Sequence, residues 1–168
     1  MPTATLTTGI DCCYEQHGDP ADPTIVLVHG LGSQLLAWPP GFCDLLVDEG
    51  FHVVRFDNRD SGLSTCLPDG TAYTLSDMAA DAVALLDHLG TVDAHFVGMS
   101  LGGMIVQTVA AGHPDRCRSM VSMASNTGNR DFGRPSGEVI EAMMAEAPDD
   151  PSARTEKEVV DNRLWCST

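Results

Sequence analysis

Apolar and polar positions along residues 24–125 predict strands and helices in turn. Four short runs are predicted as strands, and the first of them, residues 24–29, is a continuous β-branched run without polar alternation, which is typical of a strand covered on both faces. These runs span residues 24–29, 51–57, 92–97 and 118–124. Between them, helix-forming segments span residues 40–49, 76–89 and 101–111. The alternation predicts an α/β fold, with a mostly parallel sheet and helices on both faces.

Local signals refine the ends of these elements. Ser76 suits the N-cap of the helix over 76–89, and Gly90 suits its C-terminal stop. The runs 3–8 and 10–16 flank Gly9 and predict a hairpin at an antiparallel edge of the sheet. We therefore expect four parallel strands joined to an N-terminal hairpin.

Residues 126–168 differ in character from the preceding chain. Residues 126–137 are rich in Gly, Asn, Arg and Pro and predict a loop. A helix is predicted over 138–147, and a weaker one over 155–165, after a break at the prolines of 148–151. No further strand is predicted, so we divide the chain into a core over 1–125 and a helical segment over 126–168.

Composition and charge narrow the classes of partner. Apolar residues make up 43% of the chain and charged residues 20%, which are values of a globular protein. The 24 acidic residues against 9 basic ones give a net charge of −15, which repels phosphate backbones and anionic membranes. We therefore expect neither a nucleic acid nor a membrane as partner, while the oligomeric state stays open.

Cofactor, metal and targeting signals give the next set of expectations. The six cysteines have no zinc-site spacing, and no cofactor motif occurs, so we expect no cofactor and no metal. The first eight residues lack the basic and apolar regions of a leader. A reduced, cytoplasmic protein is the resulting expectation.

The candidate nucleophile lies in residues 98–102, Gly-Met-Ser-Leu-Gly, between a predicted strand and a predicted helix. The G-x-S-x-G pattern is weak by itself, but this strand–turn–helix context is the one it requires. Ser100 is therefore the candidate nucleophile. The N–H of Leu101, at the helix start, is a candidate oxyanion donor. The alternative is a tight turn with an ordinary serine.

A second glycine-rich loop, His29-Gly30-Leu31-Gly32, directly follows the first predicted parallel strand. Such a loop brings backbone N–H groups to the same end of the sheet as Ser100. We predict Leu31 as the second oxyanion donor, with Gly32 as the alternative. His29 lies inside the turn at a strand end, so we favour a structural role over that of a catalytic base.

The third motif, residues 57–64 (Asp-Asn-Arg-Asp-Ser-Gly-Leu-Ser), follows the second predicted parallel strand. Its polar side chains are expected to hydrogen-bond the loop backbone and fix its shape. A solvated surface loop is the plainer interpretation, and an acid–base role for Asp57 is the minority one.

Together these three motifs resemble the α/β-hydrolase superfamily. Residues 29–32 match its HGxG oxyanion loop, and residues 98–102 match its nucleophile elbow. Residues 57–64 match its D-x-R-G-x-G-x-S loop, except that Asp60 stands where glycine is usual. The variant loop and the start of a helical segment are most similar to anthracycline methyl-esterase-like and lactonase-like members.

The resemblance implies that these residues correspond to the N-terminal portion of the fold. Family members continue through a helical cap and two more strands, and the catalytic acid and histidine follow those strands. We thus expect residues 126–168 to be the beginning of the cap, and the sheet to be truncated after its sixth strand. Its last strand, 118–124, would then expose an apolar edge.

The missing triad partners bear on activity, because a serine hydroxyl needs a base within about 3 Å. None of the six histidines is expected to act as the base, because His29 is assigned a structural role and the predicted topology places the other five away from Ser100 (His17, His52, His88, His95 and His113). Asp131 is the nearest carboxylate after the 118–124 strand, and it is a weak candidate. The chain alone is expected to show little activity, as a truncated gene product would.

Two functions remain open from the sequence. The first is a serine hydrolase acting on a small carboxylic ester or lactone through Ser100. The second is a non-catalytic remnant that binds a small apolar ligand or a partner chain. Dehalogenase-like chemistry would need a carboxylate at the nucleophile position, so Ser100 argues against it.

Overall fold

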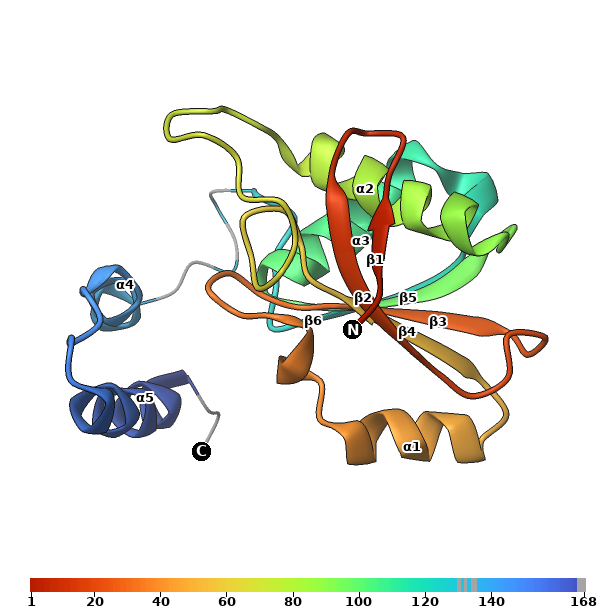
Figure 1. Ribbon diagram of the computed structural model, residues 1–168. Coiled ribbons are helices and arrows are strands. Elements are labelled where there is room, and N and C mark those ends of the chain that lie inside the picture. Colours follow the sequence, from red (N-terminus) through yellow and green to blue (C-terminus); the bar gives the residue numbers. More distant parts are fainter. Residues whose placement is uncertain (130, 132, 134–135, 166–168) are drawn as a thin grey trace. The chain divides into compact units, whose positions relative to one another are not determined.

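The computed structural model describes residues 1–129, 131, 133 and 136–165 (Figure 1). The chain divides into two compact units, Met1–Gly128 and Asn129–Thr168, which are described separately. No helix in the described part of the chain combines the length and apolar character needed to cross a membrane.

The first unit is built on a six-stranded sheet in the order β1-β2-β4-β3-β5-β6. The strands are β1 (Thr3–Thr5), β2 (Asp11–His17), β3 (Thr24–Val28), β4 (His52–Phe56), β5 (Ala94–Met99) and β6 (Cys117–Met123). The pairs β4/β3, β3/β5 and β5/β6 are parallel, whereas β1/β2 and β2/β4 are antiparallel. The predicted set of four parallel strands with an antiparallel hairpin at one edge is therefore confirmed.

Helices cover both faces of this sheet, as the alternation predicts. They are α1 (Pro40–Asp48), α2 (Leu75–Leu89) and α3 (Leu101–Gly112), with short 3-10 turns η1 (Leu35–Ala37) and η2 (Pro114–Arg116). Figure 1 shows α2 and α3 on one face and α1 on the other. The larger core lies between the sheet and α2/α3, and a smaller one lies under α1.

The ends of several elements differ from the prediction. The N-cap of α2 is Thr74 rather than Ser76, because Thr74 and Asp77 form a capping box in which each side chain accepts a backbone N–H of the other. Gly90 ends the helix in the left-handed conformation, as predicted (φ 69°). Strand β5 begins at Ala94 rather than residue 92, since Val92 is exposed.

Strand β6 lies at the end of the described sheet, opposite the hairpin. Its apolar side chains are largely exposed, with Met120 at 43% and Val121 at 49%. Val121 and Met123 pair in register with Val97 and Met99 of β5, so these four side chains lie on the same face of the sheet. The expected apolar edge is therefore present in the described residues.

The second unit contains α4 (Gly137–Met144) and α5 (Pro151–Trp165), which contact each other. Lys157 links them, because its ammonium donates to the Ala142 carbonyl at 3.2 Å and pairs with Asp161 at 2.5 Å. Helix α5 begins four residues before the predicted start. A proline is tolerated at its first position, and the Asp150 side chain accepts the Ala153 N–H at 2.9 Å.

Candidate active site

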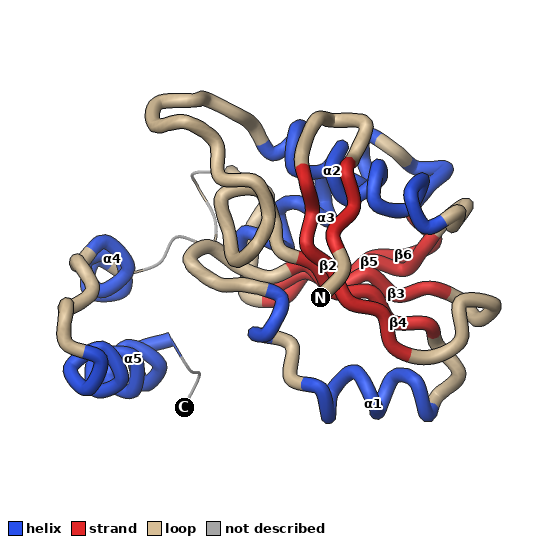
Figure 2. Tube along the Cα trace, in the orientation of Figure 1, coloured by secondary structure: helices blue, strands red, loops and turns tan. Residues whose placement is uncertain are grey.

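Neighbouring parallel strands have their carboxyl ends on the same side of the sheet. The three motif loops follow the carboxyl ends of β3, β4 and β5. Figure 2 shows long loop segments gathered at these strand ends. The predicted convergence of the three motifs is therefore realised within the first unit.

Ser100 occupies the turn between β5 and α3 in a strained backbone conformation, with φ 54° and ψ −119°. A positive φ at a residue other than glycine costs about 1–3 kcal/mol and is maintained only by surrounding contacts. Here the Ser100 N–H donates to the Met123 carbonyl of β6 at 2.9 Å. The Ser125 hydroxyl donates to the Ser100 carbonyl at 2.8 Å. The elbow is thus held from β6 and the segment that follows it.

Two glycines allow the elbow to pack against neighbouring backbone. A Cβ at Gly98 would overlap the Gly102 carbonyl, and one at Gly102 would overlap the Val28 carbonyl of β3. Neither neighbour is a flexible side chain, so neither could move aside. The pattern G-x-S-x-G is therefore required sterically at this position.

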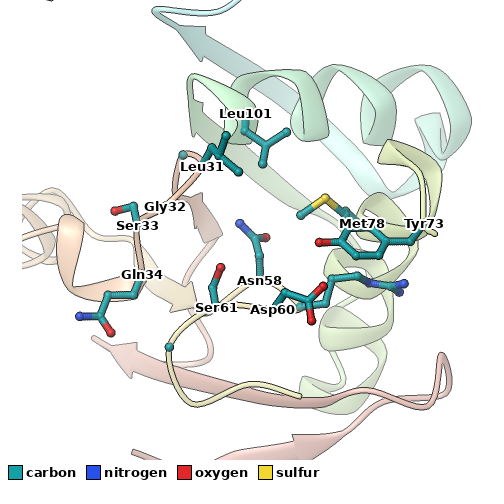
Figure 3. Close-up of a pocket in the computed structure, with 13 residues that line it drawn as sticks. Leu31, Gly32, Ser33, Gln34, Asn58, Asp60, Ser61, Tyr73, Met78 and Leu101 are labelled. Atoms are coloured by element: carbon teal, nitrogen blue, oxygen red, sulfur yellow. The ribbon is translucent and has the colours of Figure 1, made fainter. Parts of the chain in front are cut away.

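The loop of residues 29–32 approaches the Ser100 turn closely. A Cβ on Gly30 would lie 3.3 Å from the Ser100 Cβ. Leu31 and Leu101, the two predicted oxyanion residues, line the same cavity of about 460 Å³, and Gly32 also lines it. Figure 3 shows Leu31 and Leu101 close together at one end of the cavity. The structure therefore brings these residues together beside the Ser100 turn.

His29 is buried and both of its ring nitrogens are engaged. Nδ1–H donates to the Gly30 carbonyl at 2.8 Å, and Nε2 accepts the Asn58 N–H at 3.1 Å. Burial lowers the pKa of His29 below its ordinary value, which keeps the ring neutral. The ring joins the loop after β3 to the loop after β4, in agreement with the structural role favoured from the sequence.

Asp57 is likewise committed to backbone groups. Its two carboxylate oxygens accept the N–H groups of Leu35 (2.7 Å) and Leu63 (2.9 Å), and the side chain is buried. The Ser64 hydroxyl donates to the Asp57 carbonyl and accepts the Cys13 N–H. The predicted loop-fixing role of this motif is observed, because both carboxylate oxygens of Asp57 are engaged by backbone N–H groups.

A buried ion pair beside the cavity was missed by the sequence analysis. Arg59 donates from Nε and Nη2 to the two oxygens of Asp81, at 2.7 and 2.8 Å, and these hydrogen bonds raise the pKa of Arg59. Asp81 also accepts the Thr8 hydroxyl at 2.6 Å. A signal was available, because Asp81 falls on the apolar face of α2, three residues after Met78.

Asp60, the departure from the usual glycine, adopts φ 60°. This conformation explains a preference for glycine, and aspartate tolerates it better than most residues do. The Asp60 carboxylate accepts the Leu67 N–H at 2.6 Å. A hydrogen bond with Asp60 also raises the pKa of Tyr73, a second cavity residue that sequence reasoning missed.

The other histidines have contacts away from Ser100. His52 bonds with Thr24 and Gln16, and His95 with Ser119 across β5 and β6. His113 caps the far end of α3, a helix whose twelve residues span about 18 Å. No hydrogen bond among the described residues joins the Ser100 hydroxyl to an imidazole, and no three potential metal ligands cluster there.

Comparisons with known proteins agree with this architecture. Rhodomycin D methylesterase DnrP from Streptomyces peucetius is 37% identical over 134 residues, which cover 79% of this chain and 45% of DnrP. A RutD protein of Caulobacter segnis, named for carbamate hydrolysis, is 40% identical over 69% of this chain and 44% of its own length. The chain thus spans about half the length of the curated relatives it matches.

Solved structures show the same fold. Epoxide hydrolase A from Mycobacterium thermoresistibile has a TM-score of 0.70 at 27% identity, covering 87% of this chain and 45% of that one. An enol-lactonase from Burkholderia xenovorans LB400 has a TM-score of 0.70 at 25% identity, covering 98% of this chain and 66% of that one. The profile of the alpha/beta hydrolase fold matches residues 23–156, and the chain belongs to that family.

Proposed function

We propose that this chain carries the nucleophile and oxyanion hole of a serine hydrolase acting on a small carboxylic ester or lactone. The observation that carries the proposal is the strained Ser100 turn, which packs against Gly30 and precedes Leu101, two residues that line the 460 Å³ cavity. The names of the matched methylesterase and enol-lactonase agree with this substrate class.

The proposed reaction begins with attack of the Ser100 Oγ on the substrate carbonyl carbon. As the new C–O bond forms, negative charge develops on the carbonyl oxygen, and the N–H groups of Leu31 and Leu101 stabilise it. The first turn of α3 adds its positive dipole end at this point. The ester bond then breaks, the alcohol leaves with a proton, and water hydrolyses the acyl-serine.

The proton of Ser100 must pass to a base, and no histidine in the described residues is hydrogen-bonded to the Ser100 hydroxyl. His29 is held by two hydrogen bonds in its neutral form, and His95 is engaged with Ser119. We therefore infer that the base is a group other than these histidines, and that the 168-residue chain by itself turns over esters slowly. Substrate binding and oxyanion stabilisation do not need the base.

Added imidazole tests whether Ser100 can react once a base is available, because free imidazole is a base of the same kind as a histidine side chain. The measurement is p-nitrophenyl acetate hydrolysis by the chain over a series of imidazole concentrations. We expect an imidazole-dependent rate above that of imidazole alone, and we expect Ser100→Ala to abolish the excess. A matched control is Ser61→Ala, a cavity serine outside the elbow, which should retain the excess.

The second candidate, a non-catalytic binding protein, is favoured by the lack of any histidine hydrogen-bonded to Ser100 in the described residues. In that case the cavity would bind an ester or apolar ligand, while imidazole would accelerate hydrolysis equally with wild type and Ser100→Ala. Equal rates would therefore reject the hydrolase proposal in favour of binding.

A further inference from the structure

The cavity beside Ser100 is lined by one positive and one negative side chain, and only the positive one has an ion-pair partner among the residues that the structure describes. Of the thirteen residues that line it, Arg59 and Asp60 are the two with formal charges. The Arg59 guanidinium is held by both oxygens of Asp81, and the two side chains are only 9% and 4% exposed. The positive charge is therefore neutralised by a buried partner before any ligand enters.

Asp60 differs from Arg59 in its exposure and in its lack of an ion-pair partner in the described part of the chain. Its side chain is exposed, and no Lys or Arg forms an ion pair with it among the described residues. It accepts the Leu67 N–H and a hydrogen bond from Tyr73, which are neutral donors and leave its charge in place. Figure 3 shows Asp60 and Tyr73 among the side chains that border the cavity.

The net charge of −15 adds a background field of the same sign. A ligand in this cavity is therefore close to one carboxylate without an ion-pair partner in the described residues, within the negative electrostatic field of the whole chain. A cationic group would be attracted, and an anionic group would be repelled.

From this geometry we propose that Asp60 is a specificity-determining residue, which makes the cavity select esters that carry a positive charge over those that carry a negative one. The proposal rests on the proposed function, since it names the substrate class of the same site. It concerns binding, so it can be tested without turnover.

The test compares three small acetate esters of similar size: acetylcholine, neutral 3,3-dimethylbutyl acetate and anionic 4-acetoxybutanoate. Their dissociation constants would be measured by amide NMR titration of the chain without imidazole, with the Gly32 and Leu101 signals as reporters. The key variant is Asp60→Asn, because asparagine tolerates a positive φ and its Oδ1 can still accept the Leu67 N–H. The matched control is Asp69→Asn, which removes the same charge from an exposed residue outside the cavity.

We expect the wild-type chain to bind acetylcholine more tightly than the neutral ester, and the anion most weakly. Two charges about 4 Å apart in water interact by about 1 kcal/mol, which corresponds to about a fivefold change in affinity. Asp60→Asn should weaken acetylcholine binding and strengthen anion binding by about that factor, while the neutral ester is unaffected. Asp69→Asn should retain the wild-type order, and salt at roughly 1 M should narrow the differences.

Failure of this inference is distinguishable from failure of the proposed function. If Asp60→Asn leaves the three dissociation constants as they are in wild type, Asp60 does not select the charge of the ester, while ester binding stands. If Asp69→Asn has as large an effect as Asp60→Asn, the selection belongs to the net charge and not to Asp60. If none of the esters shifts the cavity signals, both proposals fall.

Discussion

Strands β3 and β6 are both parallel neighbours of β5, yet their surroundings differ sharply. All five residues of β3 are buried, whereas most of β6 is exposed, including Met120 and Val121. Strand β3 is covered by α1 on one face and by α2 and α3 on the other. Strand β6 has α3 on one face, and its other face shows Val121 and Met123.

The difference matters because the candidate site draws on both strands. The loops after β3 and β4 are fixed by buried groups, since His29 and Asp57 each join two separate backbone segments. The Ser100 turn is packed on β3 through Gly102, but two of its hydrogen bonds depend on Met123 and Ser125. The loops after β3 and β4 are therefore well supported, while part of the support for the Ser100 turn comes from the exposed strand β6.

The largest effect is expected at the contact between β3 and the elbow. Gly102→Ala would place a Cβ against the Val28 carbonyl, where backbone must shift, and should destabilise the chain by about 3 kcal/mol or more. Gly112→Ala, at the other end of the same helix, has no atom within 4 Å and should be neutral or stabilising by up to about 1 kcal/mol. Urea denaturation measures both, and equal effects would refute the close-packed junction.

A matched pair of valines sharpens the comparison of the two strands. Val26→Ala in β3 removes two fully buried methyl groups and should cost about 2 kcal/mol. Val121→Ala in β6 alters a side chain that is 49% exposed and should stay within about 0.5 kcal/mol. If the two substitutions cost the same in urea denaturation, β6 is buried in solution by something that covers it, such as a second copy.

The smallest expected effect is a pH dependence of the free energy of unfolding, which arises from two buried histidines in and beside β3 and β4. Burial lowers the pKa of His29 and of His52 below the ordinary value of 6.5. Below that pH the unfolded chain takes up protons that the folded chain resists, so the free energy of unfolding falls as the pH drops from 6.5 towards the folded pKa values. Above it, both states are neutral and these rings contribute no slope.

Urea denaturation over a series of pH values measures that slope. His29→Gln should flatten it, and the double variant with His52→Gln should flatten it further, whatever the stability of each variant at neutral pH. A slope in His29→Gln as steep as that of wild type would contradict a buried, neutral imidazole.

Most of the fold could be predicted from the sequence because its parallel strands and their helices leave strong local patterns. The apolar run of β3 and the stop at Gly90 are examples in which periodicity and a single residue decide the structure. Ser76 is the predicted N-cap of α2 but Thr74 is the observed one, because Thr74 forms a capping box with Asp77. The early start of α5 is not predicted, because proline usually breaks a helix although it is tolerated at a first helical position.

The site was predictable where the spacing of glycines determines the backbone conformation. It was less predictable where side chains that are far apart in the sequence contact each other. Ser100, Leu31 and Leu101 came from motifs, and the structure places the two leucines on one cavity. The pairing of Arg59 with Asp81 joins residues 22 positions apart, and the approach of Tyr73 to Asp60 depends on a loop path that no local pattern encodes. Such contacts follow from the tertiary fold rather than from periodicity.

The central claim is that Ser100 is the nucleophile, and the site of acylation tests it most directly. The chain would be incubated with p-nitrophenyl acetate and imidazole, quenched in acid, digested and mapped by mass spectrometry. The account predicts one acetyl group on the peptide that contains Ser100, and none on that peptide in Ser100→Ala. Acetyl groups found only on other residues, or on that peptide equally in both proteins, would contradict it.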